Sequence, residues 1–439
     1  MQENKKLKIL VVPSDKTGVG GFRSIWPHVK LEELYPNEFH IDVDYQPKLD
    51  NDNFLKQYDI IHYHRTLGAY EHMDNWEELG SDGKPNGVKH EGILNKCKRL
   101  GIVTIMDIDD YWAVGNHHPA YLLIKNSGLD KMILNNIKLA HNVTTTTEFY
   151  AEEIRKHCKN VFIMPNSIDP SEKQFITKPE PSERVRIGWL GGSSHMHDLE
   201  ILRGVFKQIK SDGLLDKVQF VLCGYDLRGM ITMINEQTKE QTQRPITPKE
   251  SVWYQYERIF TNDYQNVSPE YAKFLQTFKE EDYPNVANEP YRRVWTKSVN
   301  SYASNYNLFD VALAPLEENI FNKVKSQLKI IEAGFHKKAL IAQDFGPYQI
   351  DIKSAFQYGG GFDTTANGIL VETVKNHKDW YKAIKKLILE PELIPTLGNN
   401  LYNTVKDTYS IEAVCATRRD LYKQLVAEIK KPIVEEILK

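Results

Sequence analysis

Hydrophobic residues gather in short runs along the first half of this chain, and amphipathic stretches separate most of the runs. The runs are KILVVP near the start, HIDVDY (40–45), YDIIHYH (58–64), GIVTIMDID (101–109), NVTTTT (142–147) and NVFIMP (160–165). Their length and content of β-branched residues are typical of buried strands, and the stretches between them have helical patterns. This alternation predicts a parallel sheet covered by helices.

The second half repeats the plan. Its runs are VRIGWLG from residue 185, KVQFVLCG (217–224), LFDVALAP (308–315), KALIAQD (338–344) and GILVE (368–372). Each half opens with a strand, a glycine turn (DKTGVGGFRS or GGSSHMHD) and a helix, which is the first unit of a nucleotide-binding sheet. We therefore predict two Rossmann-like domains, at 1–178 and 179–400, followed by helices at 401–439. The charged, proline-containing segment 177–184 predicts the linker.

An aromatic, charged segment interrupts the strand pattern between residues 226 and 306. It contains Trp253, Tyr254, Tyr256, Tyr264, Tyr271, Tyr283, Tyr291 and Trp295. We interpret it as an insertion in the second domain.

Composition narrows the class of protein. The chain has 439 residues, 56 basic and 59 acidic, with a net charge of −3, so no strong field favours nucleic acid. Four widely spaced cysteines without a C-x-x-C pair indicate neither disulfides nor a zinc site and fit a reducing compartment. The first apolar run is too short for a signal peptide or membrane span. We expect a cytoplasmic protein, with at most peripheral association at the inner face of a membrane.

The segment FNKVKSQLKIIEAG (321–334) is the most informative stretch for chemistry. A helix starting near Lys325 would place Lys325, Lys329 and Glu332 on one face, with Ser326 in its first turn. Two ammonium groups and free backbone N–H groups suit a diphosphate, and a carboxylate further along suits ribose hydroxyls. The segment follows the carboxyl end of a predicted strand, where α/β sheets bind ligands. A solvated surface helix with an i,i+4 charge pattern is the alternative.

Gly191 and Gly192 follow the first strand of the second domain and would let backbone approach a ligand. Ser193, His197 and the pair His195 and Asp198 surround the start of the next helix. Alternatively, the glycines only make a tight turn and Asp198 only caps the helix.

Three segments, PNSID (165–169), IIEAGFHKKALIAQDFGPYQ and NGILVE, occur in an order that resembles family 4 glycosyltransferases of the GT-B fold. The resemblance implies two Rossmann-like domains facing a cleft, with C-terminal helices crossing back to pack on the N-terminal domain. It implies sugar transfer from a nucleotide-sugar donor, held by the C-terminal domain, to a glycan or lipid-linked glycan acceptor on the N-terminal side. Hexosyl transfer with retention, in glycan or polysaccharide biosynthesis and without a required metal or other cofactor, follows from the same resemblance.

The sequence departs from the family pattern at two places. Glu332 matches the second of two family glutamates, but the first falls on Val324. The Arg and Lys of the family are replaced by GGSSHMHD, so we expect Lys325, Lys329 and His195 or His197 to compensate the phosphate charge. Lys325, Lys329 and His118 are our candidate catalytic residues.

On the acceptor side we expect the loop of Gly20, Gly21 and Arg23, the strand end at His64, and Asp109 to face the sugar or acceptor. A structural role is the commoner one for any single histidine here. The acidic cluster at Asp107, Asp109 and Asp110 could alternatively hold Mg²⁺ or Mn²⁺. We favour its acids as strand-end and cap residues that orient acceptor hydroxyls.

Three other classes of protein remain as alternatives. A nucleotide-sugar epimerase of related fold would need acids and bases around the sugar. A dehydrogenase would share the glycine turn, but GVGGFRSIW lacks the G-x-G-x-x-G spacing. A glycan-binding protein could stack sugars on the aromatic insertion, although it would have no need of Lys325, Lys329 and Glu332.

Overall fold

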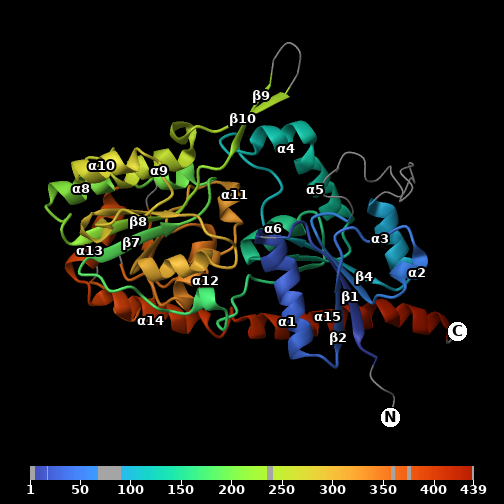
Figure 1. Ribbon diagram of the computed structural model, residues 1–439. Coiled ribbons are helices and arrows are strands. Elements are labelled where there is room, and N and C mark those ends of the chain that lie inside the picture. Colours follow the sequence, from blue (N-terminus) through green and yellow to red (C-terminus); the bar gives the residue numbers. More distant parts are fainter. Residues whose placement is uncertain are drawn as a thin grey trace. The chain divides into compact units, whose positions relative to one another are not determined.

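The computed structural model describes residues 5–16, 18–67, 90–234, 241–356, 361–372 and 377–437 (Figure 1). The chain divides into two compact units. Unit 1 comprises Met1–Asp169, Asn319–Leu328 and Asp407–Lys439, and unit 2 comprises Pro170–Glu318 and Lys329–Lys406. Each unit contains a six-stranded sheet whose strand pairs are all parallel, so the predicted fold class, two Rossmann-like α/β domains, is confirmed.

The sheet of unit 1 has the order β2-β1-β3-β4-β5-β6. Its strands coincide with the predicted runs: β1 Leu7–Val12, β2 Phe39–Val43, β3 Ile60–His64, β4 Val103–Ile108, β5 Val143–Thr145 and β6 Val161–Ile163. The order reverses between β1 and β3. In open α/β sheets such a reversal leaves a crevice at the carboxyl ends of the strands, where ligands bind.

Helices cover the sheet of unit 1. A π-helix at Gly20–Ile25 runs into α1, and the α-helices are α1 Trp26–Leu34, α2 Asp52–Leu55, α3 His90–Arg99, α4 Tyr121–Ser127, α5 Leu129–Leu139, α6 Glu148–Arg155, α11 Ile320–Lys323 and α15 Ile411–Ile437. The C-terminal helix α15 packs on α1, as predicted: the Tyr422 hydroxyl lies 2.7 Å from Nε2 of His28. Arg419 donates two hydrogen bonds to the Glu38 carboxylate, beside β2.

The sheet of unit 2 has the order β11-β8-β7-β12-β13-β14 and reverses between β7 and β12. Its strands are β7 Val185–Leu190, β8 Val218–Tyr225, β11 Tyr291–Trp295, β12 Val311–Ala314, β13 Ala339–Gln343 and β14 Ile369–Val371. The α-helices are α7 Met196–Glu200, α8 Val205–Ser211, α9 Val252–Phe260, α10 Pro269–Leu275, α12 Leu328–Phe335, α13 Lys378–Leu389 and α14 Leu393–Val405. A hairpin, β9 Met230–Ile234 and β10 Gln241–Pro245, extends from this unit.

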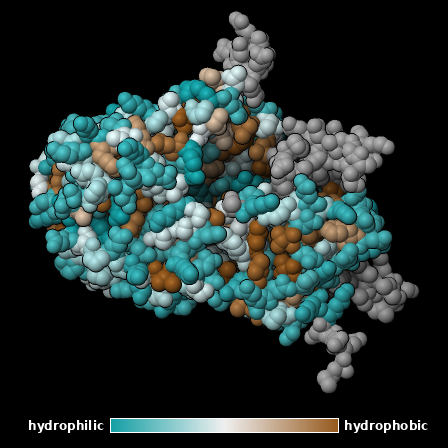
Figure 2. Space-filling view, in the orientation of Figure 1, coloured by the Kyte–Doolittle hydropathy of each residue, from teal (hydrophilic) through white to brown (hydrophobic). Residues whose placement is uncertain are grey.

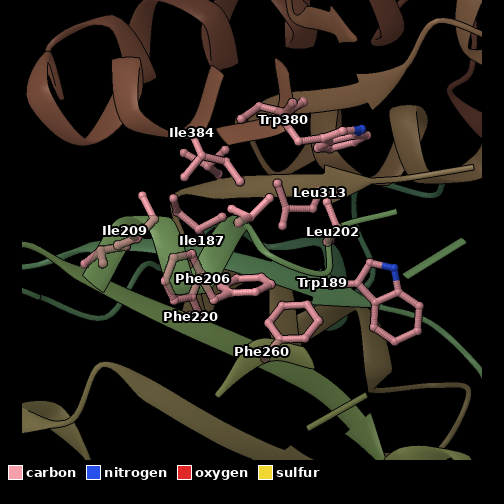
Figure 3. Packing of buried hydrophobic residues seen from close by; sticks show 14 of the residues in the cluster. Ile187, Trp189, Leu202, Phe206, Ile209, Phe220, Phe260, Leu313, Trp380 and Ile384 are labelled. Carbon is pink, nitrogen blue, oxygen red and sulfur yellow. The ribbon is translucent and has the colours of Figure 1, made fainter. Parts of the chain in front are cut away.

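The core of unit 2 is apolar and aromatic. Figure 3 shows Phe206 of α8, Phe220 of β8 and Phe260 of α9 gathered together, and the Phe206 ring centroid lies 4.5 Å from that of Phe220 and 4.9 Å from that of Phe260. Trp189 and Trp380 are fully buried in the same cluster. This packing joins the insertion helix α9 to the sheet.

The segment 226–306 is therefore more than an insertion, which corrects the sequence interpretation. It supplies β11, which pairs with β8 as the edge strand of the sheet, and the helices α9 and α10. Trp253, Tyr256, Tyr271 and Tyr291 are all buried in the core, so these rings stack on protein rather than on a glycan. Residues 235–240 of the segment lie outside the described residues.

The helix predicted to start near Lys325 begins only at Leu328, so that prediction is wrong. Asn319 caps the short helix α11 by accepting a hydrogen bond from the backbone nitrogen of Asn322. The chain then turns at Val324, whose side chain is fully buried in the core of unit 1. Lys325 lies in this turn and does not share a helix face with Lys329 and Glu332.

Candidate functional site

Asp198 joins two loops at the strand-order reversal of unit 2. One loop follows β7 and the other follows β12, and both leave the carboxyl ends of their strands. The Asp198 carboxylate accepts a hydrogen bond from the backbone nitrogen of Glu317 at 2.7 Å, and its other oxygen lies 2.6 Å from Nδ1 of His195. Because Asp198 is only 4% exposed, it acts as a buried brace between the two loops. This position is where a doubly wound sheet binds its ligand.

The surroundings of the two glycines in the β7 loop differ. A Cβ at Gly191 would lie 2.4 Å from the Trp189 ring, so packing alone requires the absence of a side chain there. At Gly192 an added Cβ would meet no described atom within 4 Å. Gly192, Ser193 and His197 are exposed, so this part of the loop can meet a ligand.

Tyr256 of α9 contacts the backbone of the same loop. Its hydroxyl accepts a hydrogen bond from the backbone nitrogen of His195 at 2.9 Å and lies 3.4 Å from the carbonyl of Gly192. Sequence reasoning missed this residue, because its partner is backbone 61 positions away. The only sequence signal is the spacing of Trp253 and Tyr256, which predicts a shared buried face of a helix.

Lys329 reaches the carboxyl end of β7 from the first turn of α12. Its ammonium donates a hydrogen bond to the carbonyl of Leu190 and lies 5.2 Å from the centroid of the Trp189 ring. The structure therefore brings Lys329 to the β7 loop, beside Gly191 and Gly192.

Glu332 lies further along α12 and is only 3% exposed. The hydroxyls of Tyr302 and Tyr306 each donate a hydrogen bond to one of its carboxylate oxygens. Burial raises the pKa of Glu332, against the opposing effect of the Tyr302 hydrogen bond and the charge of Lys329. A ribose at this position would have to compete with two tyrosine hydroxyls.

In unit 1, Asp109 gathers the polar residues at the carboxyl ends of β3 and β4. Nε2 of His64 and Nη2 of Arg65 both lie 3.0 Å from the same Asp109 oxygen. Burial opposes ionisation of Asp109, but the His64 hydrogen bond and the Arg65 charge hold the pKa of its carboxyl below the usual range. Arg65 has a φ of 60°, a left-handed conformation that is rare outside glycine and points to a constrained strand end.

Arg23 has a structural position rather than the loop position expected for it. It is 2% exposed, forms a bidentate ion pair with Asp107 at 2.7 and 3.0 Å, and also donates to Asn166. Gly20 and Gly21 belong to the π-helix, where a Cβ would clash with the Asp15 carbonyl in one case and approach the Trp26 ring to 2.9 Å in the other. Their glycines are therefore explained by packing.

His118 and Lys325 meet across the ring of Phe321. The His118 ring lies 5.4 Å from Phe321, and the Lys325 ammonium lies 5.0 Å from the same ring. Burial and the charge of Lys325 lower the pKa of His118. Nearby, Ser326 accepts a hydrogen bond from Asn166 of the PNSID segment at 3.0 Å.

The candidate residues thus fall into two groups. His118, Lys325 and Ser326 belong to unit 1, whereas Lys329 and Glu332 belong to unit 2. The unit boundary falls between Leu328 and Lys329, at the start of α12.

Asp107 and Asp109, from the acidic cluster weighed as a metal site, are engaged by protein side chains. Asp107 forms an ion pair with Arg23, and Asp109 forms an ion pair with Arg65 and a hydrogen bond with His64. Within the described ranges, no three His, Cys, Asp or Glu side chains are grouped so as to hold a metal ion. The four cysteines are buried free thiols.

The surface in Figure 2 is mostly hydrophilic, with smaller hydrophobic areas. The most exposed large apolar side chains are Leu122 and Leu123 on α4, at 64% and 70%. In the part of the chain that the structure describes, none of the helices has the length and apolar character needed to span a membrane.

Comparison with known proteins supports the fold. Neither a family model nor a curated protein matches this sequence. Among solved structures, a sucrose-phosphate synthase from Thermosynechococcus elongatus is similar with a TM-score of 0.57 and 13% identity, covering 97% of this chain and 100% of that chain. A glycosyltransferase from Rickettsia africae gives 0.54 and 13%, covering 96% and 99%. HepE from Anabaena, in complex with UDP, gives 0.51 and 10%, covering 96% and 100%. These similarities show that the chain has the GT-B fold.

Proposed function

We propose that this protein is a glycosyltransferase that moves a sugar from a nucleoside-diphosphate donor to a glycan or lipid-linked glycan acceptor. The observation that carries the proposal is Lys329, whose ammonium lies at the carboxyl end of β7 beside the exposed Gly192 and Ser193. The GT-B fold agrees with it, as do the names of similar structures: a sucrose-phosphate synthase, a glycosyltransferase and a UDP complex.

Bond cleavage leaves negative charge on the departing diphosphate. A preorganised cation aimed at that charge stabilises the transition state more than the ground state. Lys329 is our candidate for this role. His197 is exposed on the same loop system and is our candidate for a second phosphate contact.

Unit 1 is assigned the acceptor in this proposal. Asp109, His64 and His118 offer hydrogen-bonding groups at or near the carboxyl ends of its strands, and Lys325 adds a positive charge beside His118. For a retaining hexosyl transfer, the departing phosphate can take the proton of the acceptor hydroxyl, so no dedicated side-chain base is required. We place the reaction in glycan or polysaccharide biosynthesis and expect no cofactor.

Thermal stabilisation by a panel of UDP, GDP, ADP, CMP and their sugars tests the proposal. A ligand at 100 times its dissociation constant adds about 2.7 kcal/mol to the free energy of unfolding, which raises the melting temperature measurably. We expect one nucleoside diphosphate and its sugar to stabilise the full chain, and the nucleoside diphosphate to be released when the sugar is transferred to a glycan acceptor. Absence of stabilisation by every member of the panel would refute the donor assignment.

A further inference from the structure

Unit 2 has a cavity of about 550 Å³ at the end of its sheet opposite to Lys329. Its walls come from the chain just before β7, β12 and β13 and from α14. These are the amino ends of the strands, whereas the donor site proposed above is at their carboxyl ends. The volume is in the range of sites that take small-molecule ligands. The cavity is therefore a separate candidate site.

Three cations line this cavity, namely Arg184, Lys337 and Lys338. The lining carboxylates are Glu183 and Asp310, and Asp310 is already paired with a cation outside the lining. That cation is Arg186, whose guanidinium donates two hydrogen bonds to it at 2.7 and 3.2 Å. The cavity therefore has an excess of positive charge.

Arg184 also lines the cavity, and among the described residues no carboxylate pairs with its guanidinium. Its guanidinium donates hydrogen bonds to the backbone carbonyls of Leu215, Val218 and Asn288, at 2.6, 3.2 and 3.0 Å. These neutral acceptors fix the orientation of the group without cancelling its charge.

Lys338 gives the strongest indication that this cavity binds a ligand. Its side chain is 4% exposed and lines the cavity, yet among the described residues no hydrogen bond or ion pair engages its ammonium. Burial lowers the pKa of Lys338 to about 8, with Asp310 opposing and Arg186 reinforcing the shift. Because most of the side chain is buried, the ammonium is only partly hydrated, which is unfavourable, and a bound anion would offset that cost.

Lys337 also lines the cavity, and its ammonium lies 4.9 Å from the centroid of the Tyr402 ring. Its φ is 53°, a conformation that favours glycine, at the position that ends α12. The backbone of α14 packs closely against it, since a Cβ on Gly398 would lie 2.1 Å from the Lys337 carbonyl oxygen. A lysine at the C-terminus of a helix also interacts favourably with the helix dipole, which explains one cation but not three.

We propose that this cavity is a second ligand site, which binds a small phosphomonoester through Lys338, Lys337 and Arg184. Asn399 lines the same cavity and supplies hydrogen-bonding groups for the organic part of the ligand. The proposal goes beyond the donor site and does not depend on the proposed function.

Calorimetric titration of glycerol 3-phosphate into the full chain tests the proposal, with inorganic phosphate as a second probe. The titration is run with and without a saturating nucleoside diphosphate, so that the donor site is occupied in one arm. We expect binding in both arms, and at least a tenfold loss of affinity in Lys338→Gln. Lys273→Met is the matched control, because this exposed lysine of α10 lies outside both sites, and it should bind the phosphomonoester like the wild type.

Lys337→Gln gives an independent test, because this side chain is exposed and its replacement has little folding cost. We expect it to weaken binding about twofold to fivefold, as the loss of a partly solvated charge does. The proposal is overturned if the wild type binds neither probe while the donor site is occupied. It is also overturned if Lys338→Gln and Lys337→Gln both bind as tightly as the wild type. Failure of nucleotide binding alone would refute the donor site and leave this result unaffected.

Discussion

The hydroxyl of Tyr256 accepts a hydrogen bond at 2.9 Å from the backbone nitrogen of His195. Through this bond, a fully buried side chain of α9 fixes the loop that carries Gly192 and Ser193. Tyr256→Phe removes the hydroxyl but keeps the ring in the core. A hydrogen bond of this kind contributes about 0.5–1.5 kcal/mol. We therefore expect nucleoside diphosphate affinity, measured by calorimetry, to fall about twofold to tenfold.

Tyr264→Phe is the control for that prediction. Its hydroxyl donates a hydrogen bond to the buried Glu257 carboxylate at 2.9 Å, and Glu257 forms an ion pair with Arg293. Loss of this bond should lower the melting temperature without changing nucleotide affinity. If Tyr256→Phe changed only the melting temperature as well, Tyr256 would be a core residue with no part in positioning the loop.

The ion pair of Arg23 and Asp107 lies entirely inside unit 1, with exposures of 2% and 1%. Arg23→Met leaves a buried carboxylate without its cation, which costs about 3–5 kcal/mol. We expect urea denaturation to show that the free energy of unfolding falls by this amount. The double variant Arg23→Met with Asp107→Leu should recover part of the lost stability. A single variant within about 1 kcal/mol of the wild type would contradict the structural role assigned to Arg23.

Glu38 gives a pH-dependent prediction. Hydrogen bonds from Arg419 and Lys423 of α15 lower the pKa of Glu38 from 4.5 to about 2. A lowered carboxyl pKa stabilises the fold above the unfolded value, and this contribution is lost as pH falls from about 4.5 to about 2. The side chain is 28% exposed, so solvent screening limits the effect to about 1 kcal/mol.

Urea denaturation should thus show that Glu38→Gln has a lower free energy of unfolding than the wild type at pH 7. This deficit should shrink at pH 3. Glu33→Gln is the control, because its pair with Lys30 is a more exposed one at 3.6 Å, and it should show little deficit at either pH. A deficit for Glu38→Gln that is the same at both values would argue against the ion pair as its source.

Metal removal separates the two interpretations of the acidic cluster. Lys329 can compensate diphosphate charge, and Asp109 is already engaged by His64 and Arg65. We expect transfer activity to survive EDTA. Complete loss with EDTA, restored by Mn²⁺ and reproduced by Asp109→Ala, would instead establish Asp109 as a metal ligand.

The pattern of hydrophobic runs predicted most strands because those strands are buried on both faces. The pattern did not predict β11, because the charged residue Arg293 occupies a buried position in that strand. That charge is matched by Glu257, 36 residues earlier in the chain, and by the Tyr225 ring at 4.3 Å. A pairing of this kind is a tertiary contact that the local sequence does not reveal.

The site shows the same limit. The structure brings Lys329 to the β7 loop, and its role in binding a donor stays a prediction that rests on a general rule about the carboxyl ends of parallel strands. The start of α12 was predicted wrongly, because the burial of Val324 in unit 1 interrupts the helix before Lys325. The partners of Glu332 were missed because tyrosine hydroxyls reach it from Tyr302 and Tyr306, 30 and 26 positions away.

We propose that Lys329, at the carboxyl end of β7, binds the diphosphate of a donor. Calorimetry with the nucleoside diphosphate that stabilises the wild type most strongly tests it in Lys329→Met. Lys273→Met is the control, since this exposed lysine of α10 carries the same charge. Loss of a charged hydrogen bond costs about 1.5–3 kcal/mol. We therefore predict that Lys329→Met binds the nucleotide at least tenfold more weakly than the wild type, and that the affinity of the control variant is unchanged. Equal affinities in the wild type and Lys329→Met would contradict the claim.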